Sequence, residues 1–255
     1  MESSGDWRDA LPDMQTGAAA RRADLNAQMD ALCTGEHELS AETIDRVWQG
    51  DIGGLYDWCA STFRFLLVTR ELADGFADLC RERGTRLCAE VGAGRGEMTA
   101  ALVRRSIRCI ATDDRSWEAR PRATGGMYGT HVRALGYVEA LNALRPDTVI
   151  CAWMPNHQDW TSAFRTAPSV QRYIVIGTGP GGATGTEQTW AEHPGWQRTP
   201  LPHLARYARC RLDTLLGTPY ARLRTEIVLY TRRETISGMD GSLKWRLASN
   251  PRQLT

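Results

Sequence analysis

The chain has 255 residues, of which 42 % are hydrophobic, enough to bury the core of one domain of ordinary size. Its 31 basic and 30 acidic residues leave a formal net charge of +1, so charge gives no case for binding nucleic acid or an anionic membrane. No apolar run approaches the roughly 18 residues needed to cross a bilayer. The N-terminus is polar and lacks the apolar core of a secretory signal. We therefore expect a cytoplasmic protein with no membrane segment.

The cysteines and histidines favour free thiols over a metal centre. The seven cysteines are dispersed and include no CxxC pair, and the five histidines include no HxxxH pair. Such spacing is typical of reduced, mostly buried thiols in the cytosol, and it predicts neither a disulfide framework nor a metal site.

The first 84 residues are predicted to form a helical zone. Residues 18–33 are rich in alanine and carry apolar residues at helical spacing, and Ser40 is placed to cap a following helix. Residues 55–73 contain neither glycine nor proline and carry a wide apolar stripe. We expect one long helix there, continuing past residue 73, with Gly75 as the point where it could be interrupted.

Residues 85–180 alternate short apolar runs with helical patterns, which predicts a parallel sheet wrapped by helices. The loops that follow the strands would then share one edge of the sheet, where such folds bind ligands. The predicted strands are Leu87–Val91, Arg108–Thr112, Thr148–Trp153 and Tyr173–Gly177, and the predicted helices are Glu97–Arg105, Val138–Leu144 and Trp160–Arg165.

The remaining residues are predicted to open with a glycine-rich loop, Gly177–Gly182, and an irregular stretch through Trp196. Two strand-like runs follow, Tyr207–Leu215 and Arg224–Tyr230, and their short connection predicts an antiparallel hairpin. The polar residues from 236 onward are not assigned structure. The predicted organisation is a helical cap over 1–84, a ligand-binding domain over 85–235 and a tail over 236–255.

The strongest functional signal is the run from Glu90 to Glu97, EVGAGRGE, at the end of a predicted buried strand. Glycines at alternate positions let the backbone turn tightly and approach a ligand with no Cβ in the way. Dinucleotide-binding proteins prefer G-x-G-x-x-G, but here the sixth position is Glu97, whose charge would repel a diphosphate. Glu90 could instead accept a hydrogen bond from a cationic amino group, while backbone N–H groups receive a carboxylate.

A second acidic position strengthens this interpretation. Asp113 ends the next predicted strand, 21 residues after Gly92, where an acid is placed to bind both hydroxyls of a ribose. A ribose together with an amino-acid zwitterion describes S-adenosylmethionine.

On these residues the chain resembles the class I S-adenosylmethionine-dependent methyltransferases over about residues 84–232. The resemblance implies a Rossmann-like α/β fold of parallel strands with a C-terminal antiparallel hairpin. It implies S-adenosylmethionine as the cofactor and names the residues expected to bind it. These are Glu90, Gly92, Ala93, Gly94, Gly96, Asp113, Asp114, Trp117, Gly136, Tyr137, Ala152 and Trp153. At Gly136 and Tyr137 a backbone contact or ring packing would replace the acid that the family often places near the adenine.

Catalytic residues are sought just after the predicted strand Thr148–Trp153. The resemblance implies an active-site loop there, and Trp153–Asn156 is only weakly similar to the family's D/N-P-P-Y/F/W motif. A base is needed only where the nucleophile carries a proton, and His157 is our first choice because histidine titrates near neutral pH. Asp159 or Tyr207 would orient that histidine or the acceptor.

We expect a methyltransferase that acts on a small molecule by O- or N-methylation, because a helical cap of this size would enclose a small acceptor. A role in secondary metabolism is expected by analogy with capped members of the family. Three other classes stay open: a nucleic-acid or protein methyltransferase, an NAD-dependent oxidoreductase, and a non-catalytic binding module. No nucleic acid or membrane partner is expected, and a homodimer is left open.

Overall fold

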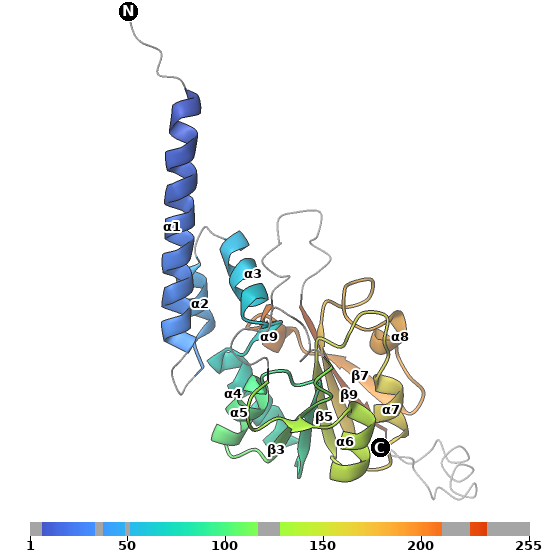
Figure 1. Ribbon diagram of the computed structural model, residues 1–255. Coiled ribbons are helices and arrows are strands. Elements are labelled where there is room, and N and C mark those ends of the chain that lie inside the picture. Colours follow the sequence, from blue (N-terminus) through green and yellow to red (C-terminus); the bar gives the residue numbers. More distant parts are fainter. Residues whose placement is uncertain (1–6, 34–37, 49–51, 117–127, 211–224, 234–255) are drawn as a thin grey trace, which may run out of the picture.

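The computed structural model describes residues 7–33, 38–48, 52–116, 128–210 and 225–233. They form a seven-stranded sheet covered by helices on both faces, with further helices from the N-terminal zone to one side (Figure 1). None of the described helices is long and apolar enough to cross a membrane.

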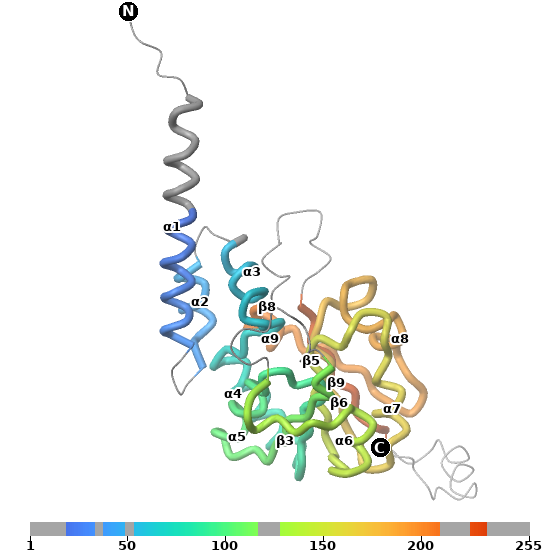
Figure 2. Tube along the Cα trace, in the orientation of Figure 1, coloured from blue at the N-terminus to red at the C-terminus, as the bar shows by residue number. Residues whose placement is uncertain are grey.

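The N-terminal zone is helical, but it is broken where one long helix was expected. Helix α1 spans Trp7–Cys33, α2 spans Ala41–Val47 and α3 spans Ile52–Ser61. These three helices lie together, away from α6 and α7 (Figure 2). Ser40 caps α2 as predicted, since its hydroxyl accepts a hydrogen bond from the Thr43 amide at 3.1 Å.

The prediction of a single helix over 55–73 was wrong. After α3 the chain forms the short strand β1, Leu66–Leu67, and then helix α4, Arg70–Glu82. Phe63 has a positive φ of 54°, which a continuing helix does not allow. Thr69 then starts the new helix, because its hydroxyl accepts a hydrogen bond from the Leu72 amide at 3.2 Å.

Gly75 does not interrupt α4. A Cβ at this position would lie 2.2 Å from a methyl carbon of Leu204, so the glycine lets α4 pack closely against helix α9, Pro202–Ala205. Gly75, which we named as a possible interruption of the helix, instead allows α4 and α9 to pack closely together.

The sheet follows the predicted alternation of strands and helices. Its strands are β2 (Cys88–Val91), β3 (Cys109–Asp113), β4 (Arg133–Ala134), β5 (Thr148–Ala152), β6 (Arg172–Gly177), β7 (Trp196–Pro200) and β9 (Glu226–Arg232). The helices between them are α5 (Glu97–Arg104), α6 (Tyr137–Leu144), α7 (Thr161–Thr166) and α8 (Glu187–Trp190). The spatial order is β4-β3-β2-β5-β6-β9-β7, and within this sheet β9 runs in the direction opposite to the other six strands, pairing antiparallel with β6 and β7.

The antiparallel final strand was predicted, but its partner was not. Strand β9 pairs with β7, Trp196–Pro200, in a stretch that we expected to be irregular. The segment predicted as its partner instead gives β8, Arg209–Cys210, which pairs with β1, and residues 211–215 lie outside the described part of the chain. Because β7 is an edge strand, it tolerates polar residues and Pro200, which hide its strand character in the sequence.

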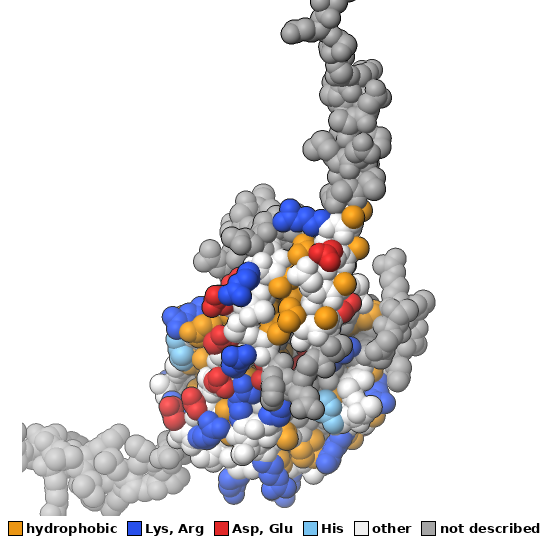
Figure 3. Space-filling model, turned by 90° about the vertical axis from the view of Figure 1, so that its left-hand side faces the viewer, with side chains coloured by type: hydrophobic (Ala, Val, Ile, Leu, Met, Phe, Trp, Pro, Cys, Tyr) orange, Lys and Arg blue, Asp and Glu red, His pale blue; other side chains and the backbone are white. Residues whose placement is uncertain are grey.

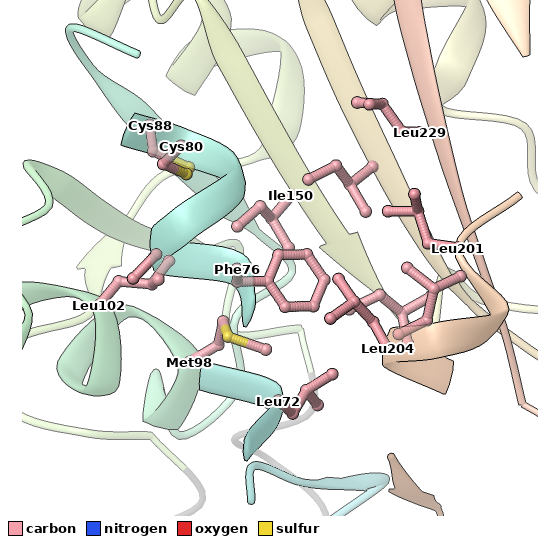
Figure 4. Close-up of a cluster of buried hydrophobic side chains, with 14 of the residues drawn as sticks. Leu72, Phe76, Cys80, Cys88, Met98, Leu102, Ile150, Leu201, Leu204 and Leu229 are labelled. Atoms are coloured by element: carbon pink, nitrogen blue, oxygen red, sulfur yellow. The ribbon is translucent and has the colours of Figure 1, made fainter. Parts of the chain in front are cut away.

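Two apolar clusters hold the helices against opposite faces of the sheet. Alternate residues of each strand point to opposite faces. Thus Ile150 and Ile174 face α4, α5 and α9, whereas Val149 and Tyr173 face α6, α7 and α8. In the first cluster Phe76 of α4 lies between Ile150 of the sheet and Leu204 of α9 (Figure 4). Helix α4 thus belongs to the core of the sheet although it precedes the first strand of that sheet.

Candidate active site

The glycine loop leaves the sheet between two neighbouring parallel strands. Strand β2 lies between β3 and β5, with Glu90 paired to Ala111 on one side and to Ile150 on the other. The loops after all three strands therefore share one edge of the sheet, at the point where the strand order reverses. Gly92, Gly94 and Gly96 all have positive φ, at 64°, 52° and 71°.

The three glycines serve different purposes. A Cβ at Gly92 would lie 2.9 Å from the Trp160 ring, and one at Gly96 would lie 2.5 Å from the His131 ring. At both positions neighbouring side chains of the protein occupy the space that a Cβ would need. A Cβ at Gly94 would meet no protein atom within 4 Å, and Gly94 lines the neighbouring cavity. Gly94 is thus the position of the loop where backbone faces open space.

Asp113 holds the glycine loop against the end of β3. Its Oδ2 accepts a hydrogen bond from the Gly94 amide at 2.9 Å, and its Oδ1 accepts one from the Arg115 amide at the same distance. Burial raises the pKa of this carboxyl above its ordinary value, against the opposing effect of these two bonds. Asp113, the residue predicted to bind the ribose, therefore also fixes the conformation of the glycine loop.

Three amides of the loop donate hydrogen bonds within the protein. The Ala93 amide donates to the Thr112 carbonyl at 3.0 Å, the Gly94 amide donates to Asp113, and the Gly96 amide donates to the Ala93 carbonyl at 2.8 Å. These three N–H groups are already bonded within the protein, and the expectation that backbone N–H groups of the motif receive a ligand carboxylate stays a prediction.

Glu90 lies almost fully buried beneath the loop, with 4 % of its surface exposed. Its Oε2 accepts hydrogen bonds from the Thr99 amide at 2.9 Å and from the Thr99 hydroxyl at 2.6 Å. Burial, the largest effect, raises the pKa of Glu90 to about 7, although the bonds from Thr99 favour the charged form. A cation placed beside this carboxyl would restore its charge.

A cavity of about 590 Å³ opens at this edge. That volume lies within the range of about 300 to 1,000 Å³ that is typical of small-molecule sites. Its wall combines the glycine loop, the ends of β3 and β5 and the segment between α3 and α4. The lining residues are Phe63, Arg64, Phe65, Leu66, Val68, Glu90, Gly92, Ala93, Gly94, Arg95, Glu97, Met98, Asp113, Asp114, Ser116, Tyr128, Tyr137, Ala152, Trp153, Met154, Pro155, Asn156, Gln158, Trp160 and Ala183.

Two arginines place positive charge in this wall. Arg64 donates to Glu97 Oε1 at 2.9 Å and Arg95 donates to the same oxygen at 3.2 Å. The Arg64 side chain is only 9 % exposed and its guanidinium also lies over the Trp58 ring, 4.9 Å from the ring centroid. Two guanidinium groups thus lie beside one carboxylate at this part of the wall.

Nine of the residues predicted to bind the cofactor line this one cavity: Glu90, Gly92, Ala93, Gly94, Asp113, Asp114, Tyr137, Ala152 and Trp153. Gly96 is not among the lining residues, because His131 and Val132 cover it. Gly136 lies beside the cavity, against Asp114, in a separate shallow pocket. Trp117 lies outside the described residues.

The three residues proposed for catalysis are not among the lining residues. His157 has an exposed side chain and a positive φ of 64°, and its amide donates to the Gly185 carbonyl at 3.0 Å. The Asp159 carboxylate accepts hydrogen bonds from the amide and hydroxyl of Thr161, at the start of α7. Tyr207 packs against the core cluster of α4, and its hydroxyl accepts a bond from Arg206. Nothing in their placement supports the assigned roles.

Strand order and strand direction together decide the fold. Numbered along the sheet's own strands, the order is 3-2-1-4-5-7-6, with strand 7 antiparallel between strands 5 and 6. The chain has the Rossmann-like fold of class I S-adenosylmethionine-dependent methyltransferases. In open α/β sheets of this kind, ligands bind at the edge where the loops after β2 and its two neighbours lie.

Comparisons with known proteins found solved structures of low similarity. No protein-family model matches the chain, and no curated protein matches its sequence. The methyltransferase domain of a bacterial Hen1 protein is 15 % identical, with a TM-score of 0.41, and the match covers 64 % of this chain and 98 % of that one. The mitomycin 7-O-methyltransferase MmcR is 17 % identical, with a TM-score of 0.39, and the match covers 81 % of this chain and 66 % of that one.

A third structure was solved with its ligands in place. It is the 1,6-didemethyltoxoflavin-N1-methyltransferase of Burkholderia thailandensis, with bound 1,6-didemethyltoxoflavin and S-adenosylhomocysteine. It is 16 % identical, with a TM-score of 0.34, and the match covers 64 % of this chain and 79 % of that one. These scores are low, so the assignment of the fold depends on the strand order and not on the matches.

Sequence reasoning missed the contribution of the segment between α3 and α4. Phe63, Arg64 and Phe65 line the cavity, but in the sequence they sit inside an apolar stripe that reads as the core of one helix. The signal that could have revealed them is Thr69, a good N-cap residue followed two positions later by Glu71, as at the start of a new helix.

Proposed function

We propose that this protein is an S-adenosylmethionine-dependent methyltransferase that acts on a small molecule. The observation that carries the proposal is a single cavity that joins the open backbone at Gly94 to the acidic side chains of Glu90 and Asp113. Backbone without a Cβ, an acid for an ammonium group and an acid for ribose hydroxyls are what this cofactor requires.

Each polar group of the cofactor has a candidate partner in the cavity wall. Asp113 would accept hydrogen bonds from the ribose hydroxyls, and Glu90 would face the α-ammonium group. The guanidinium groups of Arg64 and Arg95 would attract the α-carboxylate through charge-assisted hydrogen bonds. Tyr137 stacks on Trp160 with ring centroids 4.7 Å apart, and this pair would pack against the adenosine end.

When bound, S-adenosylmethionine supplies an electrophilic methyl carbon. The contribution of this chain is therefore to bind and orient the reacting molecules and to exclude water, and alignment of this kind accounts for much of the acceleration of two-reactant steps. We assign no general base, because His157 does not line the cavity.

A small acceptor fits the enclosed site better than a polymer does. The segment from Phe63 to Val68 adds a wall that the sheet edge alone would lack. On the face shown in Figure 3, basic and acidic side chains are interspersed, so this face has no basic stripe of the kind that a nucleic-acid site needs. The domain boundaries, a cytoplasmic location, a homodimer and a role in secondary metabolism stay predictions from the sequence.

Calorimetric titration with S-adenosylhomocysteine tests the proposal. We expect binding to the wild-type protein, and a 5- to 150-fold weaker affinity for Asp113→Ala, which corresponds to about 1 to 3 kcal/mol for a lost charged acceptor. Asp78→Ala, on the exposed side of α4, serves as the matched control and should bind like the wild type. Binding of NADH in place of S-adenosylhomocysteine would identify an oxidoreductase and refute the proposal.

A further inference from the structure

We propose that the acceptor is an uncharged planar aromatic molecule that binds against a wall formed by Phe65 and Trp153. This inference rests on the proposed methyltransferase function and names its substrate class. Phe65 comes from the segment between α3 and β1, and Trp153 directly follows β5. Their ring centroids lie 5.7 Å apart with an interplanar angle of 35°, and both rings line the cavity.

The backbone at Trp153 is held in an unusual conformation. Its φ is 59°, a left-handed value that bulky residues rarely adopt, and its amide donates to the Ile176 carbonyl at 2.8 Å. Strained conformations of this kind persist where the surrounding structure imposes them, and they concentrate at ligand sites. Here the strained residue is Trp153, whose half-buried side chain forms part of the cavity wall.

A residue with positive φ also precedes Phe65 and helps to place it in the same wall. Phe63 has a φ of 54°, so the chain turns out of α3 just before Phe65 instead of continuing as a helix. Strand β1 then fixes the segment, because Leu66 and Leu67 pair with Cys210 and Arg209 of β8. Phe65 is half-buried and lines the cavity.

The aromatic wall lies beside the proposed cofactor site. Strands β2 and β5 are parallel neighbours, with Glu90 opposite Ile150. The glycine loop and Trp153 each follow their strand at the same edge of the sheet, and both line the same cavity. A ring held at Trp153 would lie where the cofactor and acceptor must meet.

The charges of the cavity argue for an uncharged acceptor. The proposed function assigns most of the charged lining side chains to the cofactor: Glu90 to its ammonium group, Asp113 to its ribose, and Arg64 and Arg95, which also bond to Glu97, to its carboxylate. Of the remaining charged lining side chains, Asp114 accepts a hydrogen bond from the Ser116 amide. Next to the aromatic pair the wall is apolar, with Leu66, Val68 and Met98. Aromatic faces in an apolar wall favour a flat ring over a saturated one, because stacking adds to the burial of area.

Three probes of similar size separate shape from charge: 2-naphthol is flat and uncharged, trans-2-decalol is uncharged but saturated, and 2-naphthoate is flat and anionic. Binding of each would be measured by calorimetry to the wild-type protein saturated with S-adenosylhomocysteine. We expect 2-naphthol to bind at least tenfold more tightly than either of the other two. Equal affinity of the decalol, or tighter binding of the naphthoate, would overturn the inference.

Substitutions locate the site. Phe65→Leu and Trp153→Leu should each weaken 2-naphthol binding at least fivefold, while Val103→Ala, at an exposed position of α5, should leave it unchanged. Using two variants on separate segments guards against misfolding of one, and thermal unfolding checks both. Unchanged 2-naphthol affinity in both variants would overturn this inference and leave the proposed methyltransferase function standing. A wild-type protein that does not bind S-adenosylhomocysteine would refute the proposed function and this inference with it.

Discussion

Replacing Glu90 with glutamine should stabilise the folded protein at alkaline pH and weaken its binding of cofactor. The Glu90 carboxyl is buried, and its pKa is raised from an ordinary value of 4.5 to about 7. Charging this group in the folded state therefore has a cost that the unfolded chain does not bear. Glutamine keeps a carbonyl oxygen for the bonds from Thr99 and never becomes charged.

The magnitude follows from the two pKa values. As the pH rises from 4.5 to 7, the unfolded chain releases the proton of Glu90 while the folded protein retains it, so the wild type loses stability across this window. A difference of one pKa unit corresponds to about 1.4 kcal/mol. The wild type should thus lose about 3 kcal/mol by pH 8, and Glu90→Gln should keep that amount.

Urea unfolding at about pH 5 and about pH 8 measures this difference. The advantage of Glu90→Gln should be small at the lower pH and close to about 3 kcal/mol at the higher one. Glu82→Gln, at an exposed position, should follow the wild type at both. Parallel stability profiles for Glu90→Gln and the wild type would refute the reasoning. In the same variant, S-adenosylhomocysteine should bind more weakly because a neutral amide attracts its ammonium group less.

Three further outcomes are expected. Gly94→Val should weaken S-adenosylhomocysteine binding at least tenfold by calorimetry, because its side chain would enter the cavity, and unchanged affinity would show that no ligand approaches this position. Thr69→Ala should lower the free energy of unfolding in urea by about 1 to 2 kcal/mol through loss of the α4 cap, and a change near zero would contradict that role. The affinity for S-adenosylmethionine should rise with pH up to the pKa of Glu90, about 7, and then level off, since a bound ammonium lowers that pKa. Binding near pH 6 should then release a proton from Glu90. The binding heat measured by calorimetry should therefore differ between two buffers of different ionisation enthalpy, and equal heats would exclude this proton release.

Most of the sheet could be predicted because its signals are local. The strands β2, β3, β5 and β6 are short apolar runs, and glycines or acids mark their ends at Gly92 and Asp113. The glycine motif needs no distant contact to be recognised, since its spacing already indicates where backbone approaches a ligand. These are the features for which sequence and structure agree.

The break between α3 and α4 was missed because distant contacts help to impose it, and Thr69 was the local sign of it. Residues 55–73 suit a helix, but Leu66 and Leu67 pair with strand β8, far along the chain. That pairing and the Thr69 cap outweigh local helix preference. The same break brings Phe65 to the cavity, so an error in secondary structure also concealed part of the site.

His157 shows the limit of using distance in sequence as a guide to the active site. It follows the end of β5 by only a few residues, which made it a natural candidate for a base. His157 has a positive φ and its amide bonds to the Gly185 carbonyl, and it does not line the cavity, although its neighbours Asn156 and Gln158 do. Trp153, closer to the strand end, lines the cavity.

A crystal structure with bound S-adenosylhomocysteine tests the central claim most directly. We predict density in the cavity beside Gly94, with the ribose hydroxyls within hydrogen-bond distance of Asp113 and the amino group within reach of Glu90. Density for the ligand away from these three residues, or none at saturating ligand, would contradict the account.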